Sequence, residues 1–171
     1  MTTIVFIRGS PAVGKTTITK RVLHGLKESY GLHCAYIGED YFRKEMQFKY
    51  KSSDLTSHLN SVELIKTIIL KLMQLDNYDF IFIDGLFRFK EVMEKYNDFI
   101  NERGFKATYF YLHANIEEMV YRDKEFRNTK SSNIYEVNKD INSYMPNYFV
   151  KINTEQEIEE SVNQILLYLL T

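Results

Sequence analysis

The sequence holds a single cysteine, Cys34, so no disulfide can form within the chain, and this suits a reducing compartment. Its apolar runs are all too short to span a bilayer. No basic segment followed by an apolar one precedes the first predicted strand. We therefore expect a cytoplasmic protein that is not inserted in a membrane.

An excess of charge of one sign is also lacking, since the formal net charge of the 171 residues is −1. The chain thus has no overall electrostatic footprint for nucleic acid, although a local basic patch would be compatible with this balance. The four histidines are scattered without metal-ligand spacing, which argues against a zinc site. No repeat, low-complexity tract or flexible linker occurs. Because 44% of the residues are hydrophobic, residues 1–171 are predicted to form one domain with its own core.

The clearest motif stands between the apolar run at residues 4–7 and a stretch with helical periodicity. It reads Gly9-Ser10-Pro11-Ala12-Val13-Gly14-Lys15-Thr16, which is the G-x-x-x-x-G-K-T spacing of a phosphate-binding loop. The glycines permit tight backbone geometry, and the loop N–H groups with the following helix N-terminus attract an anion. Lys15 can reach the β- and γ-phosphates, and the Thr16 hydroxyl can hold Mg²⁺. We therefore predict that Gly9 through Thr17 bind the phosphates of a nucleoside triphosphate.

Apolar runs and helical periodicity alternate along the chain. Strands are predicted at 4–7, 35–37, 80–83, 107–112 and 148–152. Helices are predicted at 16–29, 61–73, 90–103, 115–126, 134–144 and 155–170, with polar loops at 49–57 and 128–133. This alternation predicts an α/β fold with three layers, in which helices cover both faces of a parallel sheet. Ligand sites in such sheets lie beyond the carboxyl ends of the strands, where Asp40, Asp84 and His113 also fall.

Asp40 follows the second predicted strand. Its carboxylate could accept a proton from a substrate hydroxyl that attacks a γ-phosphate, or it could cap the following helix. Glu39 is a weaker candidate for the same roles. Arg43, one helical turn later, is interpreted equally well as an anionic-substrate ligand and as a solvated helix charge. Three nearby aromatic residues could add an acceptor pocket, namely Phe42, Phe48 and Tyr50. Three nearby lysines could form a basic patch, namely Lys44, Lys49 and Lys51.

Asp84 ends the apolar run at residues 80–83. This is the layout in which a buried strand delivers a carboxylate to a Mg²⁺ ion or its waters. The alternative is a turn residue in an Asp-Gly pair. Arg88 follows closely and could face the site of the phosphate acceptor.

A segment of about residues 121–135 is predicted to act as a lid over the nucleotide. Arg122 and Arg127 would neutralise charge on the phosphoryl group there, and Arg122 would also contact the nucleotide. Both arginines also fit ordinary surface pairs at i,i+4 spacing, with Glu118 and Asp123. Lys124 and Lys130 are weaker candidates for the same role.

Taken together, these features resemble small P-loop kinases of the nucleotide-kinase-like group. The resemblance rests on Gly9–Thr16, on Glu39-Asp40-Tyr41-Phe42-Arg43, on Phe80–Gly85, and on Tyr109–Leu112 with the arginines that follow. Asp40 with Arg43 is similar to the D-x-x-R element of polynucleotide 5′-hydroxyl kinases. The same aspartate resembles one in chloramphenicol phosphotransferases and adenylylsulfate kinases. The resemblance implies a sheet order of 2-3-1-4-5, ATP, Mg²⁺ and an aspartate that serves as base toward the acceptor hydroxyl.

The leading hypothesis is therefore an ATP-dependent phosphotransferase with a hydroxyl acceptor on a small molecule, a nucleotide or a nucleic-acid 5′ end. Lys15, Asp40, Arg122 and Arg127 would be catalytic, Thr16 and Asp84 would hold the metal, and Asp40, Arg43 and Arg88 would contact the acceptor. One alternative is a nucleoside monophosphate kinase, which needs no base. Another is a regulatory or toxin-like nucleotide-binding module. A GTPase is disfavoured because Asn138-Lys139-Asp140 lacks the guanine-reading spacing. Monomer and homodimer both stay open.

Overall fold

The computed structural model describes residues 2–46, 53–127 and 133–171. Five strands form one sheet in which every neighbouring pair is parallel. Their order is β2-β3-β1-β4-β5, which confirms the predicted order 2-3-1-4-5. The bounds are β1 Thr3–Gly9, β2 Cys34–Gly38, β3 Phe80–Gly85, β4 Lys106–His113 and β5 Phe149–Asn153.

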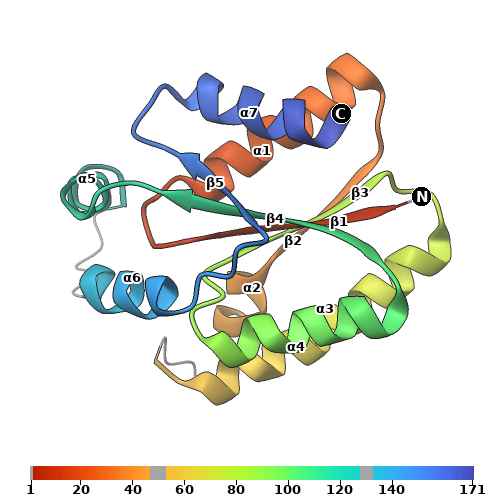
Figure 1. Ribbon diagram of the computed structural model, residues 1–171, viewed down its shortest axis with the longest axis horizontal. Coiled ribbons are helices and arrows are strands. Elements are labelled where there is room, and N and C mark those ends of the chain that lie inside the picture. Colours follow the sequence, from red (N-terminus) through yellow and green to blue (C-terminus); the bar gives the residue numbers. More distant parts are fainter. Residues whose placement is uncertain (1, 47–52, 128–132) are drawn as a thin grey trace.

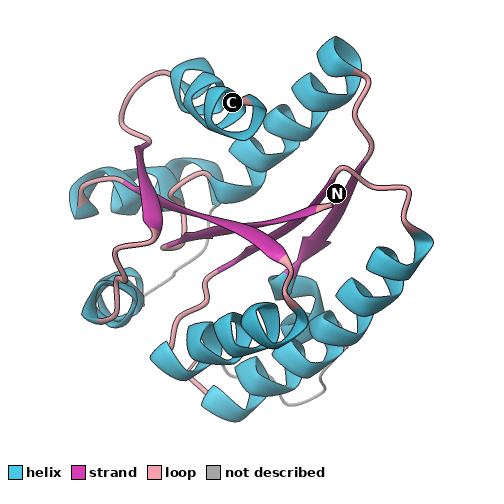
Figure 2. Ribbon diagram, turned by 45° about the vertical axis from the view of Figure 1, so that its right-hand side comes forward, coloured by secondary structure: helices cyan, strands magenta, loops and turns pink. Residues whose placement is uncertain are grey.

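Helices lie on both faces of the twisted sheet, as Figures 1 and 2 show. One face is covered by α1 and α7, and the other by α3, α4 and α6. The bounds are α1 Lys15–Tyr30, α2 Glu39–Lys44, α3 Leu55–Leu75, α4 Lys90–Arg103, α5 Ile116–Arg122, α6 Ile134–Ser143 and α7 Ile158–Leu170. This is the predicted three-layer α/β/α arrangement.

Two helix predictions need correction. The start of α3 lies at Leu55 and not at residue 61, so residues 55–57 belong to a helix and not to a loop. Asp54 caps this helix by accepting from the backbone N–H of Thr56 at 3.0 Å. The helix predicted at 115–126 ends its regular α part at Arg122 and continues as a π-helical turn, η1, over Asp123–Arg127.

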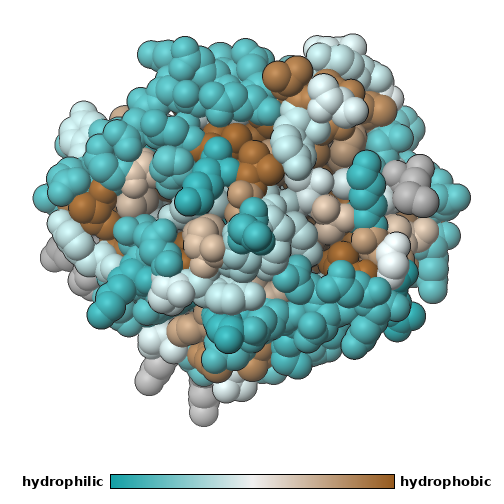
Figure 3. All heavy atoms as spheres, viewed as in Figure 1, coloured by the Kyte–Doolittle hydropathy of each residue, from teal (hydrophilic) through white to brown (hydrophobic). Residues whose placement is uncertain are grey.

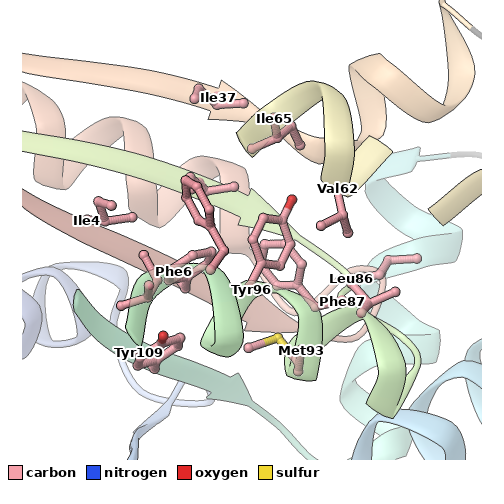
Figure 4. Packing of buried hydrophobic residues seen from close by; sticks show 14 of the residues in the cluster. Ile4, Phe6, Ile37, Val62, Ile65, Leu86, Phe87, Met93, Tyr96 and Tyr109 are labelled. Atoms are coloured by element: carbon pink, nitrogen blue, oxygen red, sulfur yellow. The ribbon is translucent and has the colours of Figure 1, made fainter. Parts of the chain in front are cut away.

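Alternating residues of β1 fill two separate cores. Val5 and Ile7 pack toward α1 and α7, whereas Ile4 and Phe6 pack toward α3 and α4. On the second side, the Phe6 ring stacks on Tyr109 with centroids 4.9 Å apart and lies 5.1 Å from Tyr96. Figure 4 shows Phe6, Tyr96 and Tyr109 within this cluster of buried side chains. β1 is thus fixed from both faces, which anchors the loop that follows it.

The face of the molecule in Figure 3 is mostly hydrophilic, and its hydrophobic side chains gather in small separate patches. Within residues 2–46, 53–127 and 133–171, no helix combines the length and the apolar character needed to cross a membrane.

Candidate active site

The loop after β1 has backbone geometry that explains its glycines. A Cβ atom on Gly9 would lie 2.6 Å from the carbonyl oxygen of Leu112 in β4, so a side chain cannot fit there. Gly14 has φ +95°, a left-handed conformation that glycine adopts without strain, and it directly precedes α1. Ala12 also has a positive φ, +60°. The loop therefore has the sharp turns of an anion-binding nest at a helix N-terminus.

Side chains of the loop are held from within and from α6. The ammonium group of Lys15 donates to the carbonyl oxygen of Ser10 at 2.8 Å. The Ser10 hydroxyl donates to Oδ1 of Asn138 at 2.7 Å. The string Asn138-Lys139-Asp140, which lacks the guanine-reading spacing, lies in α6, where Asn138 supports the loop.

Thr16 and Asp84 meet at the carboxyl end of the sheet. The Thr16 hydroxyl donates to Oδ2 of Asp84 at 2.9 Å, and the Tyr36 hydroxyl donates to the same oxygen at 3.0 Å. Burial raises the pKa of Asp84, while the positive charge of Lys15 opposes that shift. The predicted pair of metal-organising residues is thus brought together. Sequence reasoning did not single out Tyr36, because a tyrosine in a strand gives no signal of its own.

A cleft of about 1450 Å³ runs across this edge of the sheet. The phosphate-binding loop lines its middle with Pro11, Ala12, Val13, Gly14, Lys15, Thr16 and Thr17. Toward one end, after β4 and β5, lie Arg122, Phe126, Thr154 and Ile158. Toward the other, at and after the ends of β2 and β3, lie Tyr36, Asp40, Tyr41, Phe42, Arg43, Lys44 and Leu86. Its volume exceeds that of a typical pocket for one small ligand.

Asp40 lies in the first turn of α2, whose N-cap is Gly38, so the helix-cap interpretation of Asp40 is wrong. Its Oδ1 accepts from the guanidinium of Arg43, and its Oδ2 accepts from the ammonium of Lys44 at 2.6 Å. Burial alone would raise the pKa of Asp40, but the positive charges of Arg43 and Lys44 outweigh it and hold that pKa well below its usual range. Asp40 is therefore a carboxylate throughout the physiological pH range.

The two arginines predicted on the acceptor side are both buried, and of the two Arg43 lines the cleft. The Arg43 side chain is fully buried, 0% exposed, so it is not a solvated helix charge. The Arg88 guanidinium pairs with Asp140 at 2.6 Å and with Glu136 at 2.5 Å, both in α6. Arg88 is absent from the described lining of the cleft, so the expectation that it faces the acceptor is not met in this structure.

Arg122 reaches the cleft from the end of α5. Its guanidinium donates to Glu118 at 2.7 Å, as the surface-pair interpretation predicted, and also to the carbonyl oxygen of Thr154 at 2.7 Å. These contacts hold Arg122 at the mouth of the cleft beside β5. The backbone of Arg127 ends η1, and its side chain lies outside the described part of the chain.

Arg8 and Phe87 form a buried link that the sequence did not reveal. Arg8 is 0% exposed, and its Nε donates to the carbonyl oxygen of Phe87 at 3.0 Å while Nη1 donates to that of Tyr144 at 2.5 Å. Burial lowers the pKa of Arg8 to about 10. Phe87 has φ +41°, and its N–H donates to Glu39 at 3.3 Å. Phe87, in the loop after β3, therefore has a strained backbone conformation that is held at its carbonyl oxygen by Arg8 and at its N–H by Glu39.

Other candidates play smaller parts. His113 stacks on the ring of Tyr111 with centroids 5.8 Å apart. Within the described residues, no group of three or more His, Cys, Asp or Glu side chains could hold a metal ion. Several candidates lie outside the described residues, namely Phe48, Lys49, Tyr50, Lys51 and Lys130.

Comparison with known proteins supports the fold. No protein-family model matches the sequence, and the search of curated proteins finds no match either. Among solved structures, the protein APE1195 matches with a TM-score of 0.71 and 20% identity, over 98% of this chain and 94% of that one. A gluconokinase from Sinorhizobium meliloti 1021 matches with a TM-score of 0.68 and 13% identity, over 97% and 90%. The APS kinase of Mycobacterium tuberculosis, solved with AMPPNP and APS, matches with a TM-score of 0.68 and 11% identity, over 98% and 96%.

These identities establish the fold alone. The chain has the α/β fold of small P-loop kinases, as the resemblance of its motifs predicted.

Proposed function

We propose that the protein is an ATP-dependent phosphotransferase that transfers the γ-phosphate to a hydroxyl group. The observation that carries this proposal is one cleft lined by the phosphate-binding loop, by Asp84 and by Asp40. A module that only bound a nucleotide would not need a second carboxylate on the acceptor side of its phosphate site. The fold that the chain shares with a gluconokinase and an APS kinase agrees with this choice.

ATP would be held by its phosphates in the loop of residues 9–17. Lys15 would neutralise charge that spreads over the phosphoryl oxygens, and Arg122 would add a second cation at the mouth of the cleft. Arg127 is proposed for the same task from the end of η1. The apolar side chains of Phe126 and Ile158, on the Arg122 side of the cleft, would contact the base.

Mg²⁺ fits the residues present. Thr16 and Asp84 place one hydroxyl and one carboxylate oxygen 2.9 Å apart beside the phosphate loop. This is the donor set by which Mg²⁺ is bound when substrate phosphates and waters supply its other ligands. When bound, the ion would neutralise charge on the phosphate oxygens. Thr16 and Asp84 themselves would hold the metal and keep it beside α1.

Asp40 would act on the acceptor. Its carboxylate is ionised, so it would accept a hydrogen bond from the acceptor hydroxyl and orient the hydroxyl oxygen toward the γ-phosphate. It would take up the proton as the new P–O bond forms and the bond from the γ-phosphorus to the bridging oxygen breaks, so that ADP leaves with that oxygen. Each carboxylate oxygen has two lone pairs, so the contacts with Arg43 and Lys44 leave room for this bond. A strong base is unnecessary, because phosphoryl transfer is governed mainly by positioning and electrostatics.

Nucleoside monophosphate kinase activity is the second candidate. It would need cations for the acceptor phosphate. Arg88 pairs with α6, and Arg43 is buried against Asp40, which argues for a hydroxyl acceptor instead.

The test combines an acceptor screen with three variants. ATP consumption is measured against hydroxyl compounds, nucleosides, antibiotics, 5′-hydroxyl oligonucleotides and nucleoside monophosphates. We expect Lys15→Ala to abolish transfer, Asp40→Asn to abolish transfer while ATP still binds, and Lys20→Ala, on the exposed side of α1, to change neither. Full activity in Asp40→Asn would remove the base assignment. Turnover with monophosphates alone would favour the second candidate.

A further inference from the structure

Four charged or titratable side chains connect the acceptor side of the cleft with the interior. Glu39, Arg43 and His58 are all buried, with side chains 0% exposed. Glu39 Oε1 lies 3.1 Å from Nδ1 of His58, and Nε2 of His58 lies 2.9 Å from Nη1 of Arg43. Arg43 Nη2 then donates to Asp40. The series Glu39–His58–Arg43–Asp40 therefore runs from the core to the cleft.

The proton on His58 follows from its partners. A guanidinium has only donors, so Nε2 of His58 must accept from Arg43. The ring proton then lies on Nδ1 and is donated to Glu39. His58 is thus assigned as a neutral imidazole of the Nδ1–H tautomer, oriented from both sides. The ring of Phe89 also stands perpendicular to it, with centroids 5.1 Å apart.

Glu39 is itself fixed by the end of β3. Its Oε2 accepts from the N–H of Phe87 at 3.3 Å. A Cβ atom on Gly85 would lie only 2.3 Å from the same oxygen, so the carboxylate fills the space that the glycine leaves. The inner end of the series is thus held against the end of β3.

We propose that Glu39 and His58 are positioning residues for Asp40, acting through Arg43. This inference rests on the proposed phosphotransferase function, in which Asp40 orients the acceptor hydroxyl. Two carboxylates compete for the Arg43 guanidinium, since its Nε lies 3.7 Å from Glu39 while Nη2 bonds to Asp40. His58 accepts a hydrogen bond from Nη1 of Arg43 and donates one to Glu39. Both partners of the imidazole are thereby held in place, and Nη2 of Arg43 remains bonded to Asp40. Without the imidazole, the flexible arginine would turn toward the buried Glu39 and release Asp40.

The first experiment needs no variant and no acceptor. Long-range ¹H–¹⁵N NMR of ¹⁵N-histidine-labelled protein at pH 7 reports the tautomer of each ring, and the His58 signals are assigned by their loss in His58→Gln. We expect a neutral Nδ1–H ring. An Nε2–H tautomer or an imidazolium at pH 7 would overturn the proposal, because Arg43 could not then donate to that ring.

The second experiment follows the Asp40 carboxyl group by ¹³C NMR titration in folded protein, with Asp40→Asn used for assignment. In His58→Phe, which keeps a ring but removes both hydrogen bonds, we expect the Asp40 pKa to rise by about one unit as Arg43 is withdrawn. His58→Gln, which can still accept from Arg43, should give a smaller rise, and the exposed His24→Gln none. An unchanged Asp40 pKa in folded His58→Phe would contradict the proposal. If that variant does not fold, the tautomer of His58 in the wild-type protein still tests the proposal.

Measuring the affinity of the wild type and of His58→Phe for AMPPNP distinguishes a failure of this inference from a failure of the proposed function. Loss of AMPPNP binding or of transfer by the wild-type protein would remove the proposed function, whereas the tautomer and the Asp40 titration judge the positioning series directly. We expect His58→Phe to bind AMPPNP within about twofold of wild type, because the series does not include the phosphate loop.

Discussion

Tyr36 and Thr16 donate to one and the same oxygen, Oδ2 of Asp84, at 3.0 Å and 2.9 Å. Tyr36 comes from β2 and Thr16 from α1, so the carboxylate is oriented from two sides. Tyr36 would therefore orient the proposed metal ligand Asp84 without contacting the metal itself.

Replacing Tyr36 with phenylalanine should weaken the Mg²⁺ dependence of ATP binding. We expect Tyr36→Phe to need about tenfold more Mg²⁺ for half-maximal binding of a fluorescent ATP analogue, because Asp84 loses one of its orienting donors. Tyr30→Phe, at the exposed end of α1, is the control and should match the wild type. An unaltered Mg²⁺ requirement in Tyr36→Phe would show that Tyr36 merely packs beside the site.

Gly85→Ala should destabilise the fold. The added methyl group would lie 2.3 Å from Oε2 and 2.7 Å from Cβ of Glu39, whose buried side chain has nowhere to move. We expect a loss of about 3 kcal/mol in the free energy of unfolding by urea, with an unchanged m value. Gly25→Ala is the matched control: its Cβ would meet only the flexible Leu166 side chain at 3.3 Å, within helix α1. It should be neutral or gain up to about 1 kcal/mol. Equal effects in the two variants would contradict the steric argument.

Glu39 should make stability fall in acid. Burial alone raises its pKa, but the hydrogen bond from His58 and the charge of Arg43 outweigh burial and lower the pKa below its usual value. A lowered folded-state pKa means that the carboxylate stabilises the fold above about pH 4.3, and this stabilisation is lost as pH falls through the folded-state pKa.

Glu39→Gln tests this directly. At pH 7 it should cost about 3–5 kcal/mol, because it leaves the buried Arg43 charge less compensated. The difference in the free energy of unfolding between the variant and the wild type should become smaller as the pH is lowered below about 4.3. Urea unfolding from pH 7 to pH 3 measures both effects, with the exposed Glu117→Gln as control. A gap that is constant with pH would mean that the carboxylate charge is not the cause.

Much of the fold could be predicted from the sequence. Buried parallel strands read as short apolar runs, and the phosphate loop has fixed residue types because its backbone demands them. Lys15 and Thr16 were therefore predicted from the loop spacing, and Asp84 from its place at the end of an apolar run. The start of α3 did not, because Ser57, His58 and Ser61 are polar residues that are nonetheless buried. They satisfy one another and their neighbours by hydrogen bonds, and such partners have no periodic signal.

The inward arginines were hidden for the same reason. Arg8, Arg43 and Arg88 are almost completely buried, although arginine is ordinarily a surface residue. Arg8 and Arg88 are explained by partners distant in the chain, Tyr144 for Arg8 and Asp140 for Arg88. Arg43 combines a near partner, Asp40, with the more distant His58. Composition and spacing do not reveal pairs so distant in the chain, so the burial of Arg8 and Arg88 could not be predicted from the sequence.

The supports of the phosphate loop also set the order in which the site can mature during synthesis. Ser10 bonds to Asn138, 128 positions later, and Arg8 bonds to Tyr144, 136 positions later. A nascent chain that has emerged only as far as α4 contains the whole nucleotide motif but neither of these supports. Because chains emerge from the ribosome N-terminus first, the loop would be completed only after α6 has docked. Nucleotide capture would then mark the end of folding and not its beginning.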